Sequence, residues 1–367
     1  MTYLTKQKAL FTLAIRDKYI VEKTLLKIKG RQGPRKMFLH TERIGGPRGL
    51  PIVHHDKYVC DLPPNHRFPM GKFPRVLHFL IKDQVVTDKQ VWTPNLASEE
   101  LLACVHTKEY LHNFINGKIE EKEQRRTGFP WSEGIVQRCR YETGVCTGGT
   151  VLAAEIALQR GLACSTAGGT HHAFPGYGTG FCLLNDLAVA AKHWTGESTP
   201  RRRRKVLIVD LDVHQGDGTA YIFRGEPDVF TFSVHCGKNF PVRKQQSDLD
   251  VSVRDGMEDK EYLATVETHL PWLLKRFRPD LVLYDAGVDP HQEDELGRLC
   301  LTDQGLYQRD LYVIDTVVKS GTPVATVIGG GYSRDIDRLA TRHSIVHRAA
   351  TRVRSQPVFR LSLKYAF

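Results

Sequence analysis

Long apolar runs are absent from this 367-residue sequence. No stretch approaches the ~18 uncharged apolar residues that a membrane-spanning helix requires, so we expect no membrane association. Hydrophobic residues still make up 41% of the chain and charged residues 25%, which is the balance of a soluble globular protein with enough material for a core. No internal repeat is visible and no linker follows residue 50, so the sequence predicts one large domain.

Paired cysteine motifs are absent as well. The sequence contains eight cysteines, but no two of them form a CxxC pair, which excludes zinc-finger spacing. No segment is typical of a signal peptide. A reduced intracellular compartment is the simplest account, so the sequence predicts a cytoplasmic protein, or a nuclear one in a eukaryotic cell.

An excess of positive charge is missing from most of the chain, although the formal net charge of the whole sequence is +11. Residues 1–50 hold twelve Lys or Arg and three Asp or Glu, which leaves about +2 for the remaining residues. Within that remainder one run of consecutive basic residues, Arg201–Lys205, is expected to form a surface loop. A DNA-binding face needs basic residues spread over a surface, so we expect no direct nucleic-acid partner.

The basic N-terminal segment, residues 1–50, ends in Gly-Pro-rich sequence and is poor in acids. Such a composition is typical of a disordered tail, of a start codon placed too far upstream, or of an organelle transit peptide. The sequence therefore predicts a folded domain over residues 51–350, followed by a C-terminal tail over 351–367.

Beyond residue 51 the predicted strands alternate with predicted helices. Apolar, β-branched runs predict strands at 163–167, 206–211, 229–234, 280–284 and 323–328. Helical spacing of apolar residues predicts helices at 74–82, 144–160, 181–194, 260–276 and 303–319, and Ser98 is a candidate N-cap for another. The polar run 118–127 is predicted to be a solvated loop. This alternation predicts an α/β domain with a mostly parallel sheet and helices on both faces.

An unusual polar cluster follows the apolar run Val206–Leu211. It consists of Asp210, Asp212, His214 and Asp217. Because side chains alternate along a strand, Asp210, Asp212 and His214 are expected on one side. Three ionisable groups at the end of an apolar strand are costly to bury unless they hold a cation or each other. The cluster predicts a metal site, and a hydrogen-bonded strand end is the alternative.

Further polar motifs follow the other predicted strands: Gly168–His172, Ser233–His235, Asp285–Asp289 and Gly329–Tyr332. Open α/β sheets bind their ligands at the carboxyl ends of the strands. Five motifs at this edge therefore predict one active-site crevice. Asp285 has no assigned role and is expected to hydrogen-bond its own loop, and His54, His55, His106 and His235 are interpreted as structural.

A family resemblance rests on six motifs that occur in order between about residues 51 and 350: AGGTHHAF, GFCLLND, VDLDVHQGDG, FSVH, YDAGVD and GGGY. Together they resemble the zinc-dependent histone deacetylases, and the segments 238–241 and 287–290 look closest to class IV and bacterial deacetylase-like enzymes. The resemblance implies the arginase–deacetylase fold, a single α/β domain with its active site at the carboxyl ends of the strands.

The resemblance assigns three metal ligands, Asp212, His214 and Asp289. The chemistry of these residues agrees, because two carboxylates and one imidazole leave coordination positions for water and a substrate carbonyl. Such a donor set without thiolate suits Zn²⁺ and does not exclude Fe²⁺ or Co²⁺.

Catalytic roles are also implied by the resemblance. His172 matches the general base and acid, and His171 the neighbour that acts chiefly through its charge. Asp210 and Asp217 match the carboxylates that orient those imidazoles. Tyr332 matches the tyrosine that hydrogen-bonds the carbonyl oxygen and stabilises the oxyanion.

Substrate contacts complete the implied site. Phe181 and Phe240 match the walls of a narrow tunnel for an acylated lysine stem, and the Gly180 carbonyl lies near the amide. Gly331 allows the tyrosine loop to approach closely. The resemblance also implies a monovalent-cation site for K⁺, built by Ser233 with main-chain groups of Asp210, Asp212, His214 and Val234.

One departure concerns the substrate. Long-chain family members carry an acidic residue that grips the substrate backbone after a segment like His106–Leu111, and none among residues 113–123 can be assigned to it. The predicted substrate is an acylated lysine in a protein or peptide. The alternatives are a small-molecule deacetylase, such as an acetylpolyamine amidohydrolase, and a catalytically silent chromatin scaffold. Arginase-like chemistry is disfavoured, because a second metal needs an acid where Gly216 stands.

Overall fold

The computed structural model describes residues 49–143, 149–196 and 203–356. The predictions about the tail at 1–48, about Arg201 and Arg202 in the basic loop, and about residues 357–367 lie outside the described residues. Within the described part of the chain, no helix is both long and apolar enough to cross a membrane.

An eight-stranded sheet forms the centre of the described structure, and all of its pairings are parallel. The strand order is β2-β1-β3-β8-β7-β4-β5-β6. The strands are β1 (Ile52–Val53), β2 (Val91–Trp92), β3 (Leu162–Ser165), β4 (Val206–Asp210), β5 (Val229–Cys236), β6 (Leu249–Val253), β7 (Leu281–Asp285) and β8 (Val324–Val327). The predicted parallel α/β sheet is confirmed.

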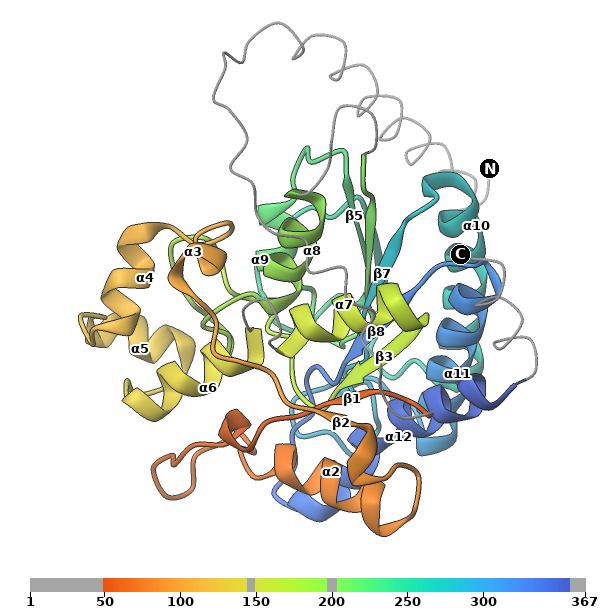
Figure 1. The fold of residues 1–367 in the computed structure, drawn as a ribbon, viewed down its shortest axis with the longest axis horizontal. Helices are drawn as coiled ribbons and strands as arrows, with labels where there is room; N and C mark the ends of the chain where they lie inside the picture. The colour runs from red at the N-terminus through yellow and green to blue at the C-terminus, as the bar shows by residue number, and fades with distance from the viewer. Residues whose placement is uncertain (1–48, 144–148, 197–202, 357–367) are drawn as a thin grey trace, which may run out of the picture.

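Helices cover both faces of this sheet (Figure 1). One face packs against α2 (Lys72–Lys82), α10 (Asp259–Phe277), α11 (Asp303–Lys319) and α12 (Ile336–Ser355). The other face packs against α6 (Glu133–Thr143), α7 (Gly149–Arg160) and α8 (Asp186–Gly196). The other α-helices of the described residues are α3 (Glu99–Leu102), α4 (Lys108–Ile115), α5 (Glu121–Thr127) and α9 (Asp217–Ile222), and two short 3-10 helices are η1 (Asp56–Tyr58) and η2 (Asp88–Gln90). Helix α12 continues past residue 350, where we expected the domain to end.

The apolar run of β4 is explained by these two layers. Leu207 and Val209 pack in the core beneath α10–α12, whereas Val206 and Ile208 pack in the core beneath α7 and α8. Burying each such side chain contributes about 1.5–3 kcal/mol, so a central strand needs apolar residues on both of its faces.

Two predicted segments were wrong. The polar run at 118–127 contains α5, because Glu121–Arg125 and Glu123–Arg126 ion pairs form at helical spacing. The helix predicted from residue 181 begins only at Asp186, and the five residues before it form a loop at the site. In contrast, the Ser98 cap is confirmed, since its Oγ accepts a hydrogen bond from the Leu101 N–H.

Candidate active site

The carboxyl ends of β3, β4, β7 and β8 bring the predicted motifs together. Asp210 ends β4 and lies beside Asp285, which ends β7, because the two residues are register partners in the parallel sheet. Among the described residues, two buried groups of side chains that can bind a metal result: Asp212 with His214 and Asp289, and His171 with Asp210 and Asp285.

The first group has its donor atoms turned toward one point. His214 Nδ1 lies 3.0 Å from Asp212 Oδ1 and 3.0 Å from Asp289 Oδ2. The other two carboxylate oxygens are held by the backbone: the Gly330 N–H donates to Asp212 Oδ2 (2.7 Å) and the Val213 N–H to Asp289 Oδ1 (2.8 Å). The backbone therefore orients the remaining two oxygens toward the imidazole.

This group fits a catalytic metal. Ligand atoms about 2.0–2.2 Å from a tetrahedral Zn²⁺ lie roughly 3.3–3.6 Å from one another, and the 3.0 Å from His214 Nδ1 to each of the two carboxylate oxygens is close to that spacing. The glycine loop leaves room beside them, because a Cβ on Gly330 would lie 2.3 Å from Asp289 Oδ2 and 2.5 Å from Asp212 Oδ2. The oxygen and nitrogen donors suit Zn²⁺, and Fe²⁺ or Co²⁺ would also be accepted.

The expectation that Asp210, Asp212 and His214 share one strand face was wrong. Strand β4 ends at Asp210, and the chain bends before Asp212, where the Asp212 N–H donates to Asp210 Oδ1 (3.2 Å). Because strand alternation stops at the bend, Asp210 faces His171, and only Asp212 and His214 join Asp289.

Each of the two adjacent histidines has its own carboxylate. The Nδ1–H of His171 donates to Asp210 Oδ2 (2.8 Å), and that of His172 donates to Asp217 Oδ1 (2.7 Å). The ring centroids of the two histidines are 4.2 Å apart. The Nε2 atom of each ring is therefore directed away from its carboxylate, as the predicted arrangement requires.

The surroundings of these histidines shift their pKa values in opposite directions. Burial, together with the charge of the neighbouring His171, lowers the pKa of His172 to about 4, although Asp217 acts to raise it. Burial also acts to lower the pKa of His171, but the carboxylates of Asp210 and Asp212 outweigh it and raise that pKa well above its ordinary value. At neutral pH the pair thus combines one neutral and one protonated ring.

The expected hydrogen bond from Asp285 to its own loop is absent. Both carboxylate oxygens of Asp285 are buried without a hydrogen-bond partner, and Oδ2 lies 3.7 Å from His171 Nδ1. The carboxylate packs instead against the glycine loops, where a Cβ on Gly329 would lie 2.2 Å from Oδ1. Burial, together with Asp210, raises the pKa of Asp285 well above its usual value.

Tyr332 is held at the edge of the site by its backbone. Its N–H donates to Asp294 Oδ2 (2.7 Å), and its ring centroid lies 6.2 Å from that of His214. Gly331 is tightly enclosed, because a Cβ there would lie 2.5 Å from Val288 Cγ2. Burial, followed by the charges of nearby carboxylates, raises the pKa of Tyr332 well above its usual value. The phenol therefore stays protonated and able to donate.

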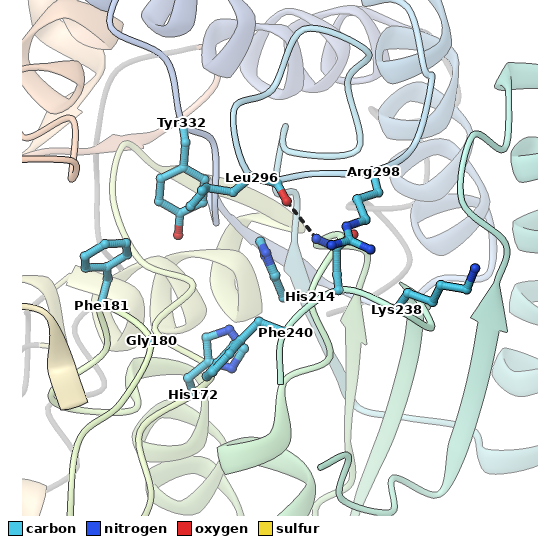
Figure 2. Close-up of a pocket in the computed structure, with 10 residues that line it drawn as sticks. His172, Gly180, Phe181, His214, Lys238, Phe240, Leu296, Arg298 and Tyr332 are labelled. Carbon is cyan, nitrogen blue, oxygen red and sulfur yellow. Dashed lines mark hydrogen bonds between the residues drawn. The ribbon is translucent and has the colours of Figure 1, made fainter. Parts of the chain in front are cut away.

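A cavity of about 300 Å³ opens over these groups (Figure 2). Phe181 and Phe240 both line it, as expected of tunnel walls, and the Phe240 ring lies 4.8 Å from that of His172. Gly180 has no space for a side chain, since a Cβ would lie 2.8 Å from His172 Cδ2. The lining residues are His172, Gly180, Phe181, His214, Lys238, Asn239, Phe240, Leu296, Arg298 and Tyr332.

Two buried cations that support the site carry no sequence signal. Lys72 Nζ donates to the carbonyls of Gly329 (3.2 Å) and Gly331 (3.4 Å), on the loop that carries Tyr332. Arg309 donates to the carbonyls of Leu211 (3.2 Å) and Gly287 (2.8 Å), on the two metal-ligand loops. A lysine or arginine in an amphipathic helix is typical of a solvated face, so neither residue could be selected from the sequence.

Two further assignments from the sequence concern the monovalent-cation site and His106. Ser233 is the register partner of Asp210, and its Oγ bonds His235 Nδ1 (2.9 Å), so the segments of the expected monovalent-cation site, Val234 included, lie side by side. Cation binding there stays a prediction. His106 has a structural position: its Nδ1 bonds the Phe174 carbonyl (3.1 Å), and its Nε2 accepts the Asn185 N–H (3.0 Å).

Comparison with known proteins agrees with this geometry. The histone deacetylase domain matches residues 66–347. An uncharacterized protein of Picosynechococcus sp. is 52% identical over 303 residues, covering 82% of this chain and 98% of that protein. Histone deacetylase 2 of Arabidopsis thaliana is 29% identical, with 75% of this chain and 71% of that protein covered. The acetoin utilization protein AcuC of Staphylococcus aureus strain COL is 28% identical, with 76% and 75% covered.

Proposed function

This chain belongs to the histone deacetylase family, and from that premise we propose that it removes acetyl or longer acyl groups from the ε-amine of lysine in a protein or peptide. One observation carries the proposal. The metal-ligand group, the histidine pair with its two aspartates, and Tyr332 meet at one apolar-walled cavity.

His172 is the proposed proton carrier. Its Nδ1–H is occupied by Asp217, so Nε2 is the atom available to accept a proton from water and return it to the departing amine. The low pKa of about 4 keeps this ring neutral at physiological pH, which is the state a general base requires. His171, held protonated by its carboxylates, contributes positive charge beside it.

Tyr332 is the proposed oxyanion donor. Its raised pKa keeps the hydroxyl protonated, and it can hydrogen-bond an amide oxygen that gains negative charge during attack. Phe181 lies beside it, with ring centroids 5.8 Å apart, and forms an apolar wall on that side. An acyl-lysine stem would lie between Phe181 and Phe240.

The proposed metal is Zn²⁺, held by Asp212, His214 and Asp289. It would supply Lewis-acid polarisation of the amide carbonyl and lower the pKa of the attacking water. The supporting observations are the oxygen and nitrogen donor set and the space that Gly330 leaves beside it.

We further propose kinship with class IV and bacterial deacetylases, for which the segments 238–241 and 287–290 are the support. A cytoplasmic location, or a nuclear one with a role in chromatin regulation, stays a prediction. So does a structural K⁺ ion near Ser233.

The experiment is hydrolysis of a matched set of lysine peptides, acetylated through myristoylated, alongside acetylated polyamines. The Zn²⁺-reconstituted protein is compared with Tyr332→Phe and His172→Ala. Turnover of a lysine peptide that both substitutions reduce by about 100-fold or more is the expected result.

Other results would assign the site differently. Turnover of polyamines alone would support the same roles for the catalytic residues but would show that the substrate is a small molecule. No turnover of any amide by a protein shown to bind Zn²⁺ would contradict the enzyme and support a scaffold.

A further inference from the structure

The rim of the cavity carries two cations that the proposed chemistry does not use. Lys238 and Arg298 both line the cavity, with their side chains 77% and 56% exposed. Figure 2 shows them on the side of the cavity opposite Phe181. Among the residues that the structure describes, no Asp or Glu lines this cavity.

The two cations share one carboxylate. Asp255 Oδ2 lies 3.8 Å from Lys238 Nζ and 3.8 Å from Arg298 Nη1, which is too long for a hydrogen bond to either. Asp255 Oδ1 accepts from the Cys236 thiol. One carboxylate cannot neutralise two cations, so this part of the rim keeps an excess positive charge.

Nearby acidic residues are engaged elsewhere. Asp294 accepts hydrogen bonds from the backbone N–H groups of Leu296, Gly297 and Tyr332. Glu295 Oε1 accepts the Arg334 N–H at 2.8 Å. Both carboxylates are therefore engaged by backbone N–H groups, and neither lines the cavity.

The positions of the two cations are fixed by a contact between their loops. Asn239 Nδ2, next to Lys238, donates to the carbonyl of Leu296 (2.7 Å), two residues before Arg298 (Figure 2). Lys244 Nζ closes the first loop by donating to the carbonyls of Asn239 (2.7 Å) and Pro241 (2.6 Å). Both charges are thus presented together at one edge of the mouth.

We infer that this basic rim selects acyl-lysines with acidic neighbours in a polypeptide and disfavours acetylated polyamines. A substrate residue beside the acyl-lysine stays outside the tunnel and lies next to Lys238 and Arg298. An acidic neighbour complements this charge, whereas a polyamine brings further ammonium groups to it. The inference rests on the proposed deacylase function and adds its substrate class.

The test uses one acyl-lysine peptide with Glu, Gln or Lys on both sides of the acylated residue, together with an acetylated polyamine and free Nε-acetyl-lysine. The expected kcat/KM is about tenfold higher for the Glu peptide than for the Lys peptide at low salt. This ratio should shrink as ionic strength rises, because exposed charges are screened. Turnover of free Nε-acetyl-lysine, a zwitterion without net charge, as fast as that of the Glu peptide would show that neighbouring residues are not needed and would overturn the polypeptide assignment.

The decisive variant is Lys238→Glu with Arg298→Glu, which should reverse the order of the Glu and Lys peptides. Lys275→Glu is the matched control, because this exposed lysine is in the last turn of α10, at the end of the sheet away from the site. It should leave the ratio unchanged. Each ratio is measured on one protein sample, so a partly misfolded fraction cancels.

Two failures are distinguishable. Equal kcat/KM for the Glu and Lys peptides, or an unchanged ratio in the double variant, would overturn the inference while the deacylase stands. Faster turnover of the polyamine than of the Gln peptide would also overturn it. No turnover of any acyl-lysine would overturn the proposed function, and the inference with it.

Discussion

At neutral pH His171 is protonated and the adjacent His172 is neutral, because the two rings have different neighbours. His171 lies among Asp210, Asp212 and Asp285, whereas His172 has Asp217 alone and a cationic ring beside it. Sequence motifs could predict that two histidines belong to the site. The family resemblance implied the division of roles between them, but the motifs alone could not give its physical cause, which is the set of carboxylates that the end of β7 and the single segment from the end of β4 to the start of α9 supply.

A substitution of Asp217 tests whether His172 depends on its carboxylate partner. Asp217→Asn should lower kcat by about 10- to 100-fold, because His172 loses the partner that fixes its tautomer and orientation. Bound Zn²⁺, measured by mass spectrometry, should stay at the wild-type level, since Asp217 is not among the three ligands. Loss of metal together with activity would contradict a role limited to His172.

A second prediction at the scale of single residues concerns Lys72. Lys72→Met keeps a similar volume but removes the donor to the Gly329 and Gly331 carbonyls. We expect kcat to fall by about tenfold, because two carbonyls on the Tyr332 loop lose a buried partner. The same substitution combined with Tyr332→Phe should cost little more than Tyr332→Phe alone. Additive losses in this double-mutant cycle would show that Lys72 acts elsewhere.

Among the elements, the sequence predicted those with strong local signals and missed those set by packing. The bounds of α11, Asp303–Lys319, were predicted as observed, because an apolar stripe follows the Thr302 N-cap. Helices α4, α6, α9 and α12 and strands β1 and β2 were not predicted, and neither were helix α5 and strand β6. The former is largely polar, and the latter alternates between buried and exposed residues at the sheet edge, so neither stands out from a loop.

Arg309 on α11 links the element scale to the site. It is fully buried beside Asp310 (2.9 Å) and donates to loops that follow β4 and β7. Arg309→Met should destabilise the fold by about 3–5 kcal/mol in urea denaturation, because it leaves Asp310 as an uncompensated buried charge. Zn²⁺ affinity should fall as well.

The double substitution Arg309→Met with Asp310→Asn separates these two effects. It removes the buried charge, so part of the lost stability should return, but the loop carbonyls still lack their donor and Zn²⁺ affinity should stay low. Full recovery of metal binding in the double variant would show that Arg309 does not position the ligand loops.

At the scale of the whole molecule, buried neutral histidines make stability depend on pH. Burial lowers the pKa of both His54 and His106 to about 4, from about 6.5 in an unfolded chain. Between these two values the unfolded chain binds protons that the folded protein does not. The free energy of unfolding should therefore fall as the pH decreases from 6.5 to 4, by up to about 1.4 kcal/mol per pH unit for each histidine.

A substitution at His106 separates the effect of histidine protonation on stability from the loss of metal in acid, because His106 is not one of the three metal ligands. A glutamine can replace both of its bonds, donating to the Phe174 carbonyl and accepting the Asn185 N–H. His106→Gln should therefore flatten the pH dependence of the unfolding free energy by up to about 3 kcal/mol over this range. The exposed His112→Gln should not. Parallel curves for wild type and His106→Gln would mean that His106 is protonated within the fold, and that acid lability begins at the metal site instead.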